Sequence, residues 1–164
     1  MDFEHVLVVG AGQMGGGIAQ VVAASGRRVS LHDSFPGATE RGLATMRKSL
    51  EKLAEKGGAD PGEVLGRVEP VDDLVPADLL VEAVVEDADV KQDVFRRADE
   101  LLPAAAVLAS NTSSITASII RSAGMSSSTG ATRASTSSGP APPFSASFSR
   151  LLRIAPRPRS IAPG

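Results

Sequence analysis

The sequence of 164 residues predicts an α/β fold in which helices cover both faces of a parallel sheet. Short apolar runs rich in β-branched residues, as at Val6–Val9, are typical of strands that are buried on both faces. These runs alternate with helix-length segments whose apolar residues recur every three or four positions. Both patterns end near Gly124, which predicts one domain over residues 1–124 and an irregular or disordered tail over residues 125–164.

A glycine-rich turn joins the first predicted strand to the first predicted helix. The strand is Val6–Val9, and Gly10-Ala11-Gly12-Gln13-Met14-Gly15 follows it directly. The apolar residues that follow recur at helical spacing and predict a helix: Ile18, Ala19, Val22 and Ala23. Gly26 stands where this helix is expected to end.

A second strand and a long amphipathic helix come next. Val29–Asp33 predicts the strand, Ser34 is a candidate helix cap, and Pro36 fits the first turn of the helix. One face of that helix is apolar and carries Leu43, Met46, Leu50 and Leu53. The Gly- and Pro-containing stretch 57–62 ends it.

The remaining elements continue the alternation. A short helical turn and a strand near Val68 are expected, followed by an apolar strand at Leu79–Val85 that Glu82 interrupts. Asp89 begins a helix that runs to Leu102, where Pro103 ends it. Val107–Ala109 predicts the next strand, which leads into Ser110-Asn111-Thr112-Ser113-Ser114.

Composition narrows the functional classes. The chain has no cysteine, which excludes disulfides and thiolate metal sites, and no metal site is expected. No apolar run approaches the roughly 20 residues that cross a bilayer, and the acidic N-terminus does not resemble a signal peptide, so a cytoplasmic protein is expected. All 19 acidic residues precede residue 101, whereas residues 121–164 carry six Arg and no acid. A basic arm of this kind can bind nucleic acid, but its arginines lie among prolines with few aromatics, so we expect no nucleic-acid partner.

The glycine-rich turn carries the clearest chemical signal. A Gly-x-Gly-x-x-Gly pattern between a strand and a helix is typical of dinucleotide-binding Rossmann domains, which are doubly wound parallel sheets. In such a turn Gly10 permits the tight bend, Gly12 lets a pyrophosphate approach the backbone, and Gly15 lets helix and strand pack closely. Asp33, about 20 residues further on, is positioned to accept hydrogen bonds from ribose hydroxyls, and its charge favours NAD over NADP.

Three motifs together resemble the 3-hydroxyacyl-CoA dehydrogenase family, in its order and at its spacing. They are Gly10-Ala-Gly-Gln-Met-Gly-Gly-Gly-Ile-Ala-Gln20, Val81-Glu-Ala-Val-Val-Glu-Asp87 and Ser110-Asn-Thr-Ser-Ser114, and the resemblance covers residues 5 to about 118. It implies an NAD-dependent oxidoreductase of fatty-acid metabolism that interconverts the 3-hydroxyl group of an acyl-CoA and a ketone. It also implies a helical dimerisation domain behind the Rossmann domain, and a homodimer in the intact enzyme.

The resemblance also carries site residues onto this chain. The cofactor contacts that it implies are Gly10, Gly12, Gln13, Met14, Gly15, Asp33, Glu86, Lys91, Asn111 and Ser113. Ser113 would in addition bond the substrate hydroxyl, while Ser49 and Lys56 would contact CoA. Their residue types alone leave other interpretations open: a solvated loop carboxylate for Glu86 and a helix cap for Ser113. For Lys56 the residue type alone favours a surface lysine.

The general base of this family has no counterpart in the sequence. Removal of the hydroxyl proton during hydride transfer requires a base, which the family provides as a histidine held by a glutamate after the Ser-Asn-Thr-Ser-Ser motif. The chain has only His5 and His32, which we interpret as a surface and a structural residue, and no acid after Glu100. The resemblance therefore predicts that this chain is catalytically incomplete and that the helical domain is absent from it.

A frame slip is a hypothesis for the origin of the tail. One set of codons for Ala134-Ser135-Thr136-Ser137-Ser138 encodes Leu-His-Phe-Phe when the reading frame is shifted by one base. The histidine of this shifted reading would lie close to where the family has its catalytic histidine. We hypothesise a one-base slip between about Ser114 and Gly124 that produced residues 125–164. The hypothesis fails if no one-base shift in the gene restores an open frame.

Two alternative functions remain open at this point. One is a related dehydrogenase of the same superfamily that acts on a sugar acid, against which Ser49 and Lys56 argue mildly. The other is a non-catalytic NAD-binding module, which fits a chain that keeps the glycine-rich turn and lacks the base.

Overall fold

The computed structural model describes residues 3–103, 105–111 and 151–154, the last four by their backbone alone. Its centre is a six-stranded sheet with the strand order β3-β2-β1-β4-β5-β6. The strands are β1 (His5–Val9), β2 (Arg28–His32), β3 (Val68–Val71), β4 (Leu79–Glu82), β5 (Val107–Asn111) and β6 (Leu151–Ile154). The first five pair in parallel, which confirms the predicted doubly wound Rossmann sheet.

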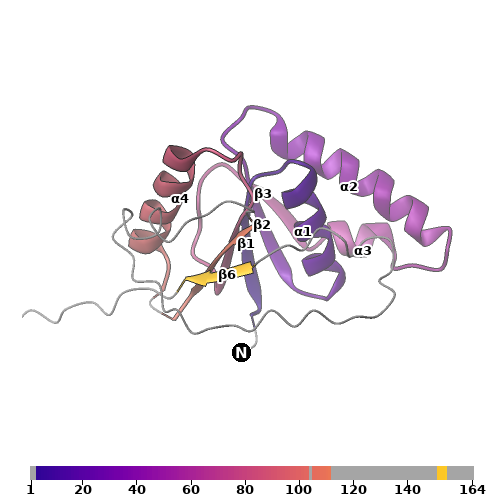
Figure 1. Cartoon of the computed structure of the whole chain (residues 1–164). Coiled ribbons are helices and arrows are strands. Elements are labelled where there is room, and N and C mark those ends of the chain that lie inside the picture. Colours follow the sequence, from indigo (N-terminus) through magenta and orange to yellow (C-terminus); the bar gives the residue numbers. More distant parts are fainter. Residues whose placement is uncertain (1–2, 104, 112–150, 155–164) are drawn as a thin grey trace, which may run out of the picture.

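Four helices connect the parallel strands and cover the sheet on two sides. They are α1 (Gln13–Ala24), α2 (Ala38–Ala54), α3 (Pro61–Leu65) and α4 (Ala88–Leu101). In Figure 1, α1, α2 and α3 lie on one side of the sheet and α4 lies on the other. Among the described residues, none of these helices has the length and apolar character that a membrane crossing requires.

The alternation of side chains along β1 explains this layering. Val6 and Val8 pack with the first three helices, while Leu7 and Val9 pack with α4. Successive side chains of a strand point to opposite faces, so a strand that is apolar throughout needs cover on both. Leu7 and Val8 are fully buried, and truncation of Leu7 to alanine would cost about 2–5 kcal/mol of unfolding free energy.

The start of α2 differs from the sequence prediction. The helix begins at Ala38 after Gly37, and Ser34 does not cap it. Pro36 and Gly37 instead form a turn in which the Ala38 N–H donates to the Phe35 carbonyl at 3.0 Å. Gly37 has φ 71° and ψ 6°, which fits a type II turn with Pro at its second position and Gly at its third.

The apolar face of α2 is only partly as expected. Met46 and Leu50 are buried, but Leu53 is 41 % exposed. Gly42 is buried instead, because α2 approaches the glycine-rich turn there: a β-carbon on Gly42 would lie 2.7 Å from the Ala11 carbonyl oxygen. The absence of a side chain at Gly42 thus lets α2 pack closely against the turn.

One strand arises within the predicted tail. β6 pairs antiparallel with β5, with Leu108 opposite Ile154 and Asn111 opposite Leu151. The prediction that residues 125–164 contain no regular element is therefore wrong for these four residues. The exposed edge of β5 offers unpaired backbone groups to any short extended segment, which a search for long periodic runs does not detect.

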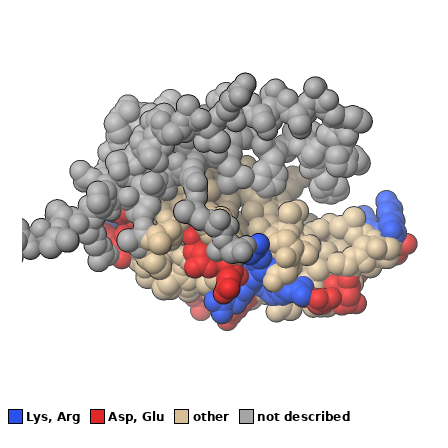
Figure 2. All heavy atoms as spheres, turned by 90° about the horizontal axis from the view of Figure 1, so that it is seen from below, with Lys and Arg blue, Asp and Glu red and all other residues tan. Residues whose placement is uncertain are grey.

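Charged side chains on one face of the molecule are mixed in sign. Figure 2 shows Lys and Arg lying beside Asp and Glu over the part of this face that the described residues form. Neighbouring acidic and basic groups offset one another, so this face does not present a field of a single sign.

Candidate cofactor-binding site

The site lies where the strand order reverses, at the carboxyl ends of β1 and β4. The chain leaves β1 through the glycine-rich turn and enters α1, while β2 and β4 end on either side of it. Open α/β sheets bind ligands at such a reversal, because the two flanking connections diverge and leave a crevice.

Two glycines of the turn are required by its packing. Gly10 has φ 106°, and a β-carbon on it would lie 2.5 Å from the Ala83 carbonyl oxygen. A β-carbon on Gly15 would lie 1.8 Å from the Gly10 carbonyl oxygen. A side chain at either position would collide with the backbone. The absence of side chains at Gly10 and Gly15 therefore allows β1, α1 and the end of β4 to pack closely together.

Gly12 differs from its neighbours because nothing restricts it sterically. It has φ −67°, which any residue adopts, and a β-carbon there would meet no heavy atom within 4 Å. The missing side chain leaves space over the first turn of α1. The first backbone N–H groups of a helix have no intrahelical partner. Gly12, the residue at the N-cap of α1, has no side chain that could accept a hydrogen bond from them.

These features fit the pyrophosphate of a dinucleotide. The first turn of α1 contains no acidic residue, so nothing there opposes an anion. The positive end of the helix dipole and the free N–H groups stabilise phosphate, and the space over Gly12 lets it approach. The residues present therefore match a dinucleotide at this position.

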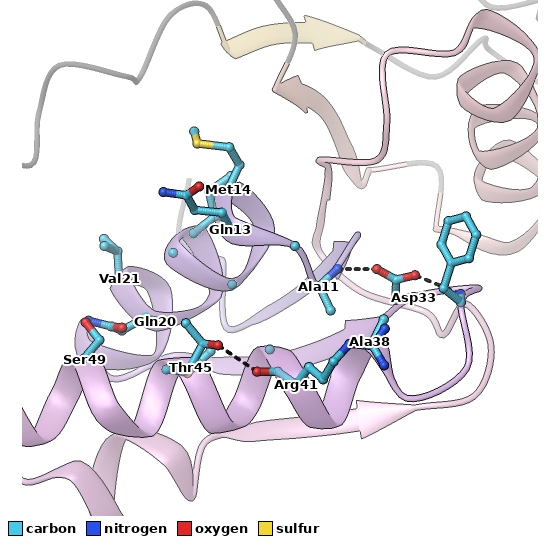
Figure 3. Close-up of a pocket in the computed structure, with 17 residues that line it drawn as sticks. Ala11, Gln13, Met14, Gln20, Val21, Asp33, Ala38, Arg41, Thr45 and Ser49 are labelled. Atoms are coloured by element: carbon cyan, nitrogen blue, oxygen red, sulfur yellow. Dashed lines mark hydrogen bonds between the residues drawn. The ribbon is translucent and has the colours of Figure 1, made fainter.

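Asp33 links the end of β2 to the glycine-rich turn. One of its carboxylate oxygens accepts a hydrogen bond from the Ala11 N–H at 2.7 Å, and the other accepts one from the Phe35 N–H at 2.9 Å. Both bonds are visible in Figure 3. They fix the orientation of the carboxylate and leave each oxygen a lone pair that can accept from a ribose hydroxyl.

A pocket of about 860 Å³ runs from Asp33 along the groove between α1 and α2. Figure 3 shows Asp33 at one end of it and Ser49 at the other. Gly12, Gln13 and Met14 also line the pocket, so the structure brings these predicted residues together with Asp33 and Ser49. Arg41 and Gly42 line it as well, although nothing in the sequence singled them out.

Lys56 is separate from this group. It lies in the turn that follows α2, where its N–H donates to the Leu53 carbonyl at 3.0 Å, and it is exposed. It is not among the residues that line the pocket. Ser113 lies outside the described residues.

The remaining predicted contacts gather on the other side of the turn. Asn111 is the last residue of β5 and is half-buried. Glu86 lies in the connection between β4 and α4, with its side chain 49 % exposed. Its carboxylate lies 3.8 Å from the ammonium group of Lys91, which projects from the first turn of α4.

Lys91 belongs to a buried polar network that sequence reasoning missed. Its ammonium group donates to Glu82 at 2.8 Å, and the Ser110 hydroxyl donates to the second oxygen of the same carboxylate at 2.5 Å. The side chains of Glu82 and Lys91 are at most 1 % exposed. The available signal was Glu82 itself, a carboxylate inside an otherwise apolar strand, which needs a partner when it is buried.

Both histidines have structural partners. The His5 ring lies 2.9 Å from the Ser30 hydroxyl, and burial, followed by the nearby charge of Arg28, lowers the pKa of His5. The His32 ring contacts the Val71 carbonyl at 3.2 Å and is buried. Within the described residues, no three His, Asp or Glu side chains are grouped so that they could hold a metal ion.

Comparison with known proteins gives consistent results. Residues 5–130 match the family profile described as the 3-hydroxyacyl-CoA dehydrogenase NAD binding domain. A probable 3-hydroxybutyryl-CoA dehydrogenase of Deinococcus radiodurans is 47 % identical over 113 residues, which are 66 % of this chain and 41 % of that protein. A fatty acid oxidation complex subunit alpha of Psychrobacter cryohalolentis is 34 % identical over 74 % of this chain and 18 % of its own length.

Solved structures agree with these sequence matches. The crystal structure of FadB2 from M. tuberculosis superimposes with a TM-score of 0.70 at 37 % identity, covering 75 % of this chain and 46 % of that one. The chain thus spans less than half the length of each of these relatives.

Proposed function

Because the chain belongs to the 3-hydroxyacyl-CoA dehydrogenase family through its NAD-binding domain, we propose that it binds NAD as the cofactor half of such an enzyme and does not by itself turn over a substrate. The proposal that the chain binds NAD is supported by the glycine-rich turn and by the hydrogen bond between Asp33 and the Ala11 N–H of that turn. The proposal that it does not by itself turn over a substrate rests on the sequence, which has no histidine after His32.

The binding geometry follows from the fold. Gly12 and the N-terminus of α1 would hold the pyrophosphate, and Asp33 would accept hydrogen bonds from the hydroxyls of the adenosine ribose. Glu86 and Asn111, at the ends of β4 and β5 across the strand reversal, would then be the candidate contacts of the nicotinamide half. When bound, NAD would supply the hydride acceptor there, and the residues of this chain would bind and orient it.

Asp33 supports NAD as the form bound. Its carboxylate is held by two backbone N–H groups and cannot turn away. A 2′-phosphate on the ribose would meet this negative charge at close range, which disfavours NADP.

A 3-hydroxyacyl-CoA is the substrate class that the relatives indicate. The matched proteins are named as 3-hydroxybutyryl-CoA dehydrogenase and as a fatty acid oxidation subunit. Ser49 lies at the end of the pocket away from Asp33, where a CoA group would not compete with the adenosine ribose. Lys56 follows α2 and can reach a CoA phosphate from its exposed position. A homodimer and a second, helical domain remain expectations drawn from the family.

Proton removal is the step that this chain does not support. The described histidines are engaged within the sheet, at Ser30 and at Val71, and neither lies at the nicotinamide side of the strand reversal. Without a positioned base, the hydroxyl proton of a 3-hydroxyacyl-CoA has no acceptor, which removes a factor of about 10²–10⁴ in rate.

The test measures cofactor binding and turnover on the same preparation. NADH and acetoacetyl-CoA are mixed with the purified chain, and the NADH absorbance is followed, with a full-length 3-hydroxybutyryl-CoA dehydrogenase as positive control. We expect saturable NADH binding and no decay of absorbance above that of buffer. Steady turnover that Asp33→Asn reduces would show that the chain contains its own acid–base group, which donates the proton in this direction and removes it in the reverse one.

The missing histidine also favours a second candidate, a non-catalytic NAD-binding module without a CoA site. Isothermal titration with free CoA distinguishes the dehydrogenase half from a module without a CoA site. Binding that weakens in Lys56→Ala supports the dehydrogenase half, while no CoA binding by a chain that binds NAD supports the module or a relative that acts on a sugar acid.

A further inference from the structure

The pocket between α1 and α2 contains two charged side chains of opposite sign. Of the described residues that line it, only Asp33 and Arg41 carry a charge. Asp33 follows β2, and Arg41 lies near the start of α2. Figure 3 shows Arg41 at the end of the pocket where Asp33 lies, with Ser49 at the other end. The end of the pocket that would take the adenosine ribose therefore carries a basic group as well as an acid.

One short turn between β2 and α2 holds both charges. The Asp33 carboxylate accepts a hydrogen bond from the Phe35 N–H at 2.9 Å. The Arg41 guanidinium donates to the Pro36 carbonyl at 3.3 Å. A β-carbon on Gly37 would lie 2.9 Å from the same guanidinium nitrogen, so this group lies directly over the turn that follows Asp33.

The guanidinium of Arg41 can donate to a further acceptor. An arginine side chain has five N–H donors, and the Pro36 carbonyl accepts from one of them. Among the residues that the structure describes, no carboxylate forms an ion pair with Arg41, and the side chain is exposed. The carboxylate of the neighbouring Glu40 accepts instead from the Thr39 hydroxyl at 3.1 Å, and Glu40 does not line the pocket.

These two charges correspond to the two ways in which Rossmann domains distinguish NAD from NADP. A carboxylate accepts a hydrogen bond from the 2′-hydroxyl of NAD, whereas a nearby arginine accommodates the 2′-phosphate of NADP. Arg41 does not directly follow Asp33 in the sequence, but the turn brings its guanidinium back to the same end of the pocket. The pocket therefore contains a group suited to each coenzyme.

We propose that Asp33 and Arg41 are opposed determinants of coenzyme choice, in which the Asp33 carboxylate selects NAD and Arg41 binds a 2′-phosphate once that carboxylate is neutralised. The preference for NAD then depends on a single negative charge. The inference rests on the proposed NAD binding and deepens it, because it assigns to Arg41 a role in specificity.

A second phosphate could approach Arg41, since CoA carries a phosphate on the 3′ position of its own adenosine ribose. The position of Arg41 favours the coenzyme, because Arg41 and Asp33 share one end of the pocket and Ser49 lies at the other. Adenosine 2′,5′-bisphosphate and adenosine 3′,5′-bisphosphate carry the two phosphate positions on otherwise identical nucleosides. Titration with both distinguishes the two sources.

The experiment is a double-mutant cycle on the full chain, measured by calorimetric titration with NAD⁺ and with NADP⁺. The variants are Asp33→Asn, Arg41→Gln and both together. Arg47→Gln is the matched control, because Arg47 is an exposed arginine of the same helix that does not line the pocket.

The expected results separate the two coenzymes. Asp33→Asn should bind NADP⁺ about tenfold more tightly than the unchanged chain, because the repulsion of the 2′-phosphate is removed. Adding Arg41→Gln should take away about tenfold of NADP⁺ affinity and much less of NAD⁺ affinity. The same pair of variants should differ more for adenosine 2′,5′-bisphosphate than for the 3′,5′ isomer. Arg47→Gln should bind every nucleotide like the unchanged chain.

Several results would overturn the proposal. Equal NADP⁺ affinity in Asp33→Asn and in the double variant would show that Arg41 does not bind the phosphate. Equal losses for NAD⁺ and NADP⁺ would mean that Arg41 only stabilises the turn, and an equal loss in Arg47→Gln would mean a general effect of surface charge. A larger loss for the 3′,5′ isomer would assign Arg41 to CoA.

The test does not depend on the folding of Asp33→Asn. If that variant does not fold, Arg41→Gln alone is compared with the unchanged chain, and the ratio of NADP⁺ to NAD⁺ affinity should fall about threefold or more. An unchanged ratio would then overturn the proposal. An unchanged chain that binds no NAD⁺ would contradict the proposed function itself, whereas normal NAD⁺ binding with no response of NADP⁺ to Arg41→Gln would contradict only this inference.

Discussion

At the scale of single residues, the three glycines of the first turn serve different purposes. Gly10 and Gly15 are needed by the packing of the protein, while Gly12 is surrounded by open space. The sequence pattern Gly-x-Gly-x-x-Gly predicted all three, but only the coordinates show that the fold requires Gly10 and Gly15 and does not require Gly12.

Gly12→Ala tests the ligand requirement. The added methyl group meets no protein atom within 4 Å, so we expect the unfolding free energy to fall by less than about 1 kcal/mol. The same methyl group occupies the space through which the pyrophosphate approaches, and NAD affinity should drop about tenfold or more. Urea denaturation and calorimetry on one preparation check both statements.

Gly15→Ala should show the opposite pattern. Its β-carbon would lie 1.8 Å from the Gly10 carbonyl oxygen, so α1 or β1 must move, at a cost of about 3 kcal/mol in unfolding free energy. A Gly15→Ala chain as stable as the unchanged chain would contradict the packing described here.

The hydrogen bonds of Asp33 and Lys91 could not be predicted from the sequence. The place of Asp33 after the second strand predicted its role toward ribose, which stays a prediction. Its bond to the Ala11 N–H was not predictable, because that contact joins residues 22 positions apart through the shape of the turn. The pairing of Lys91 with Glu82 depends in the same way on how the loop between β4 and α4 folds back.

At the scale of elements, strands and helices were predictable where their patterns were long. The alternation of apolar runs gave β1, β2, β4, α1 and α4 within a few residues of their observed bounds. The start of α2 was wrong because Ser34 is a plausible cap on its own, whereas the Pro36-Gly37 turn beside it fixes the backbone more strongly. β6 was missed because four residues carry no periodic signal.

Asp78 offers a test at the point where β1 and β4 begin. Its carboxylate accepts hydrogen bonds from the N–H groups of His5 and Glu4, at 2.9 and 3.0 Å, and these bonds lower its pKa below the usual 3.8. A carboxyl group whose pKa is lower in the folded chain stabilises the fold above its unfolded pKa, and this contribution is lost as the pH falls through the folded value.

Asp78→Asn should therefore destabilise the chain at neutral pH and progressively less below about pH 4. Urea midpoints of both chains, measured from about pH 7 down to about pH 3, give the comparison. A gap between the two chains that stays constant over this range would show that the carboxylate charge does not contribute.

At the scale of the whole molecule, the sheet and its two apolar layers were predictable and the site was predictable in part. Strands without polar alternation require helices on both faces, and a glycine-rich turn after the first strand places a dinucleotide at the strand reversal. The pocket between α1 and α2 was not predictable, since it is lined by residues of the turn and of both helices, which only the packing brings together. Residues 112–150 fall outside the described part of the chain, so the prediction for Ser113 stays a prediction.

The central claim is that this chain binds NAD at the turn between β1 and α1 with Asp33 as the ribose acceptor. Calorimetric titration of the full chain with NAD⁺ tests it most directly, alongside Asp33→Asn and the matched control Asp60→Asn, which changes an acid that caps α3 away from the site. The amide keeps the size of Asp33 but removes its charge and one acceptor oxygen. The account predicts saturable binding by the unchanged chain and by Asp60→Asn, and binding about tenfold weaker by Asp33→Asn. Equal affinity in all three chains, or no binding by a folded chain, would contradict it.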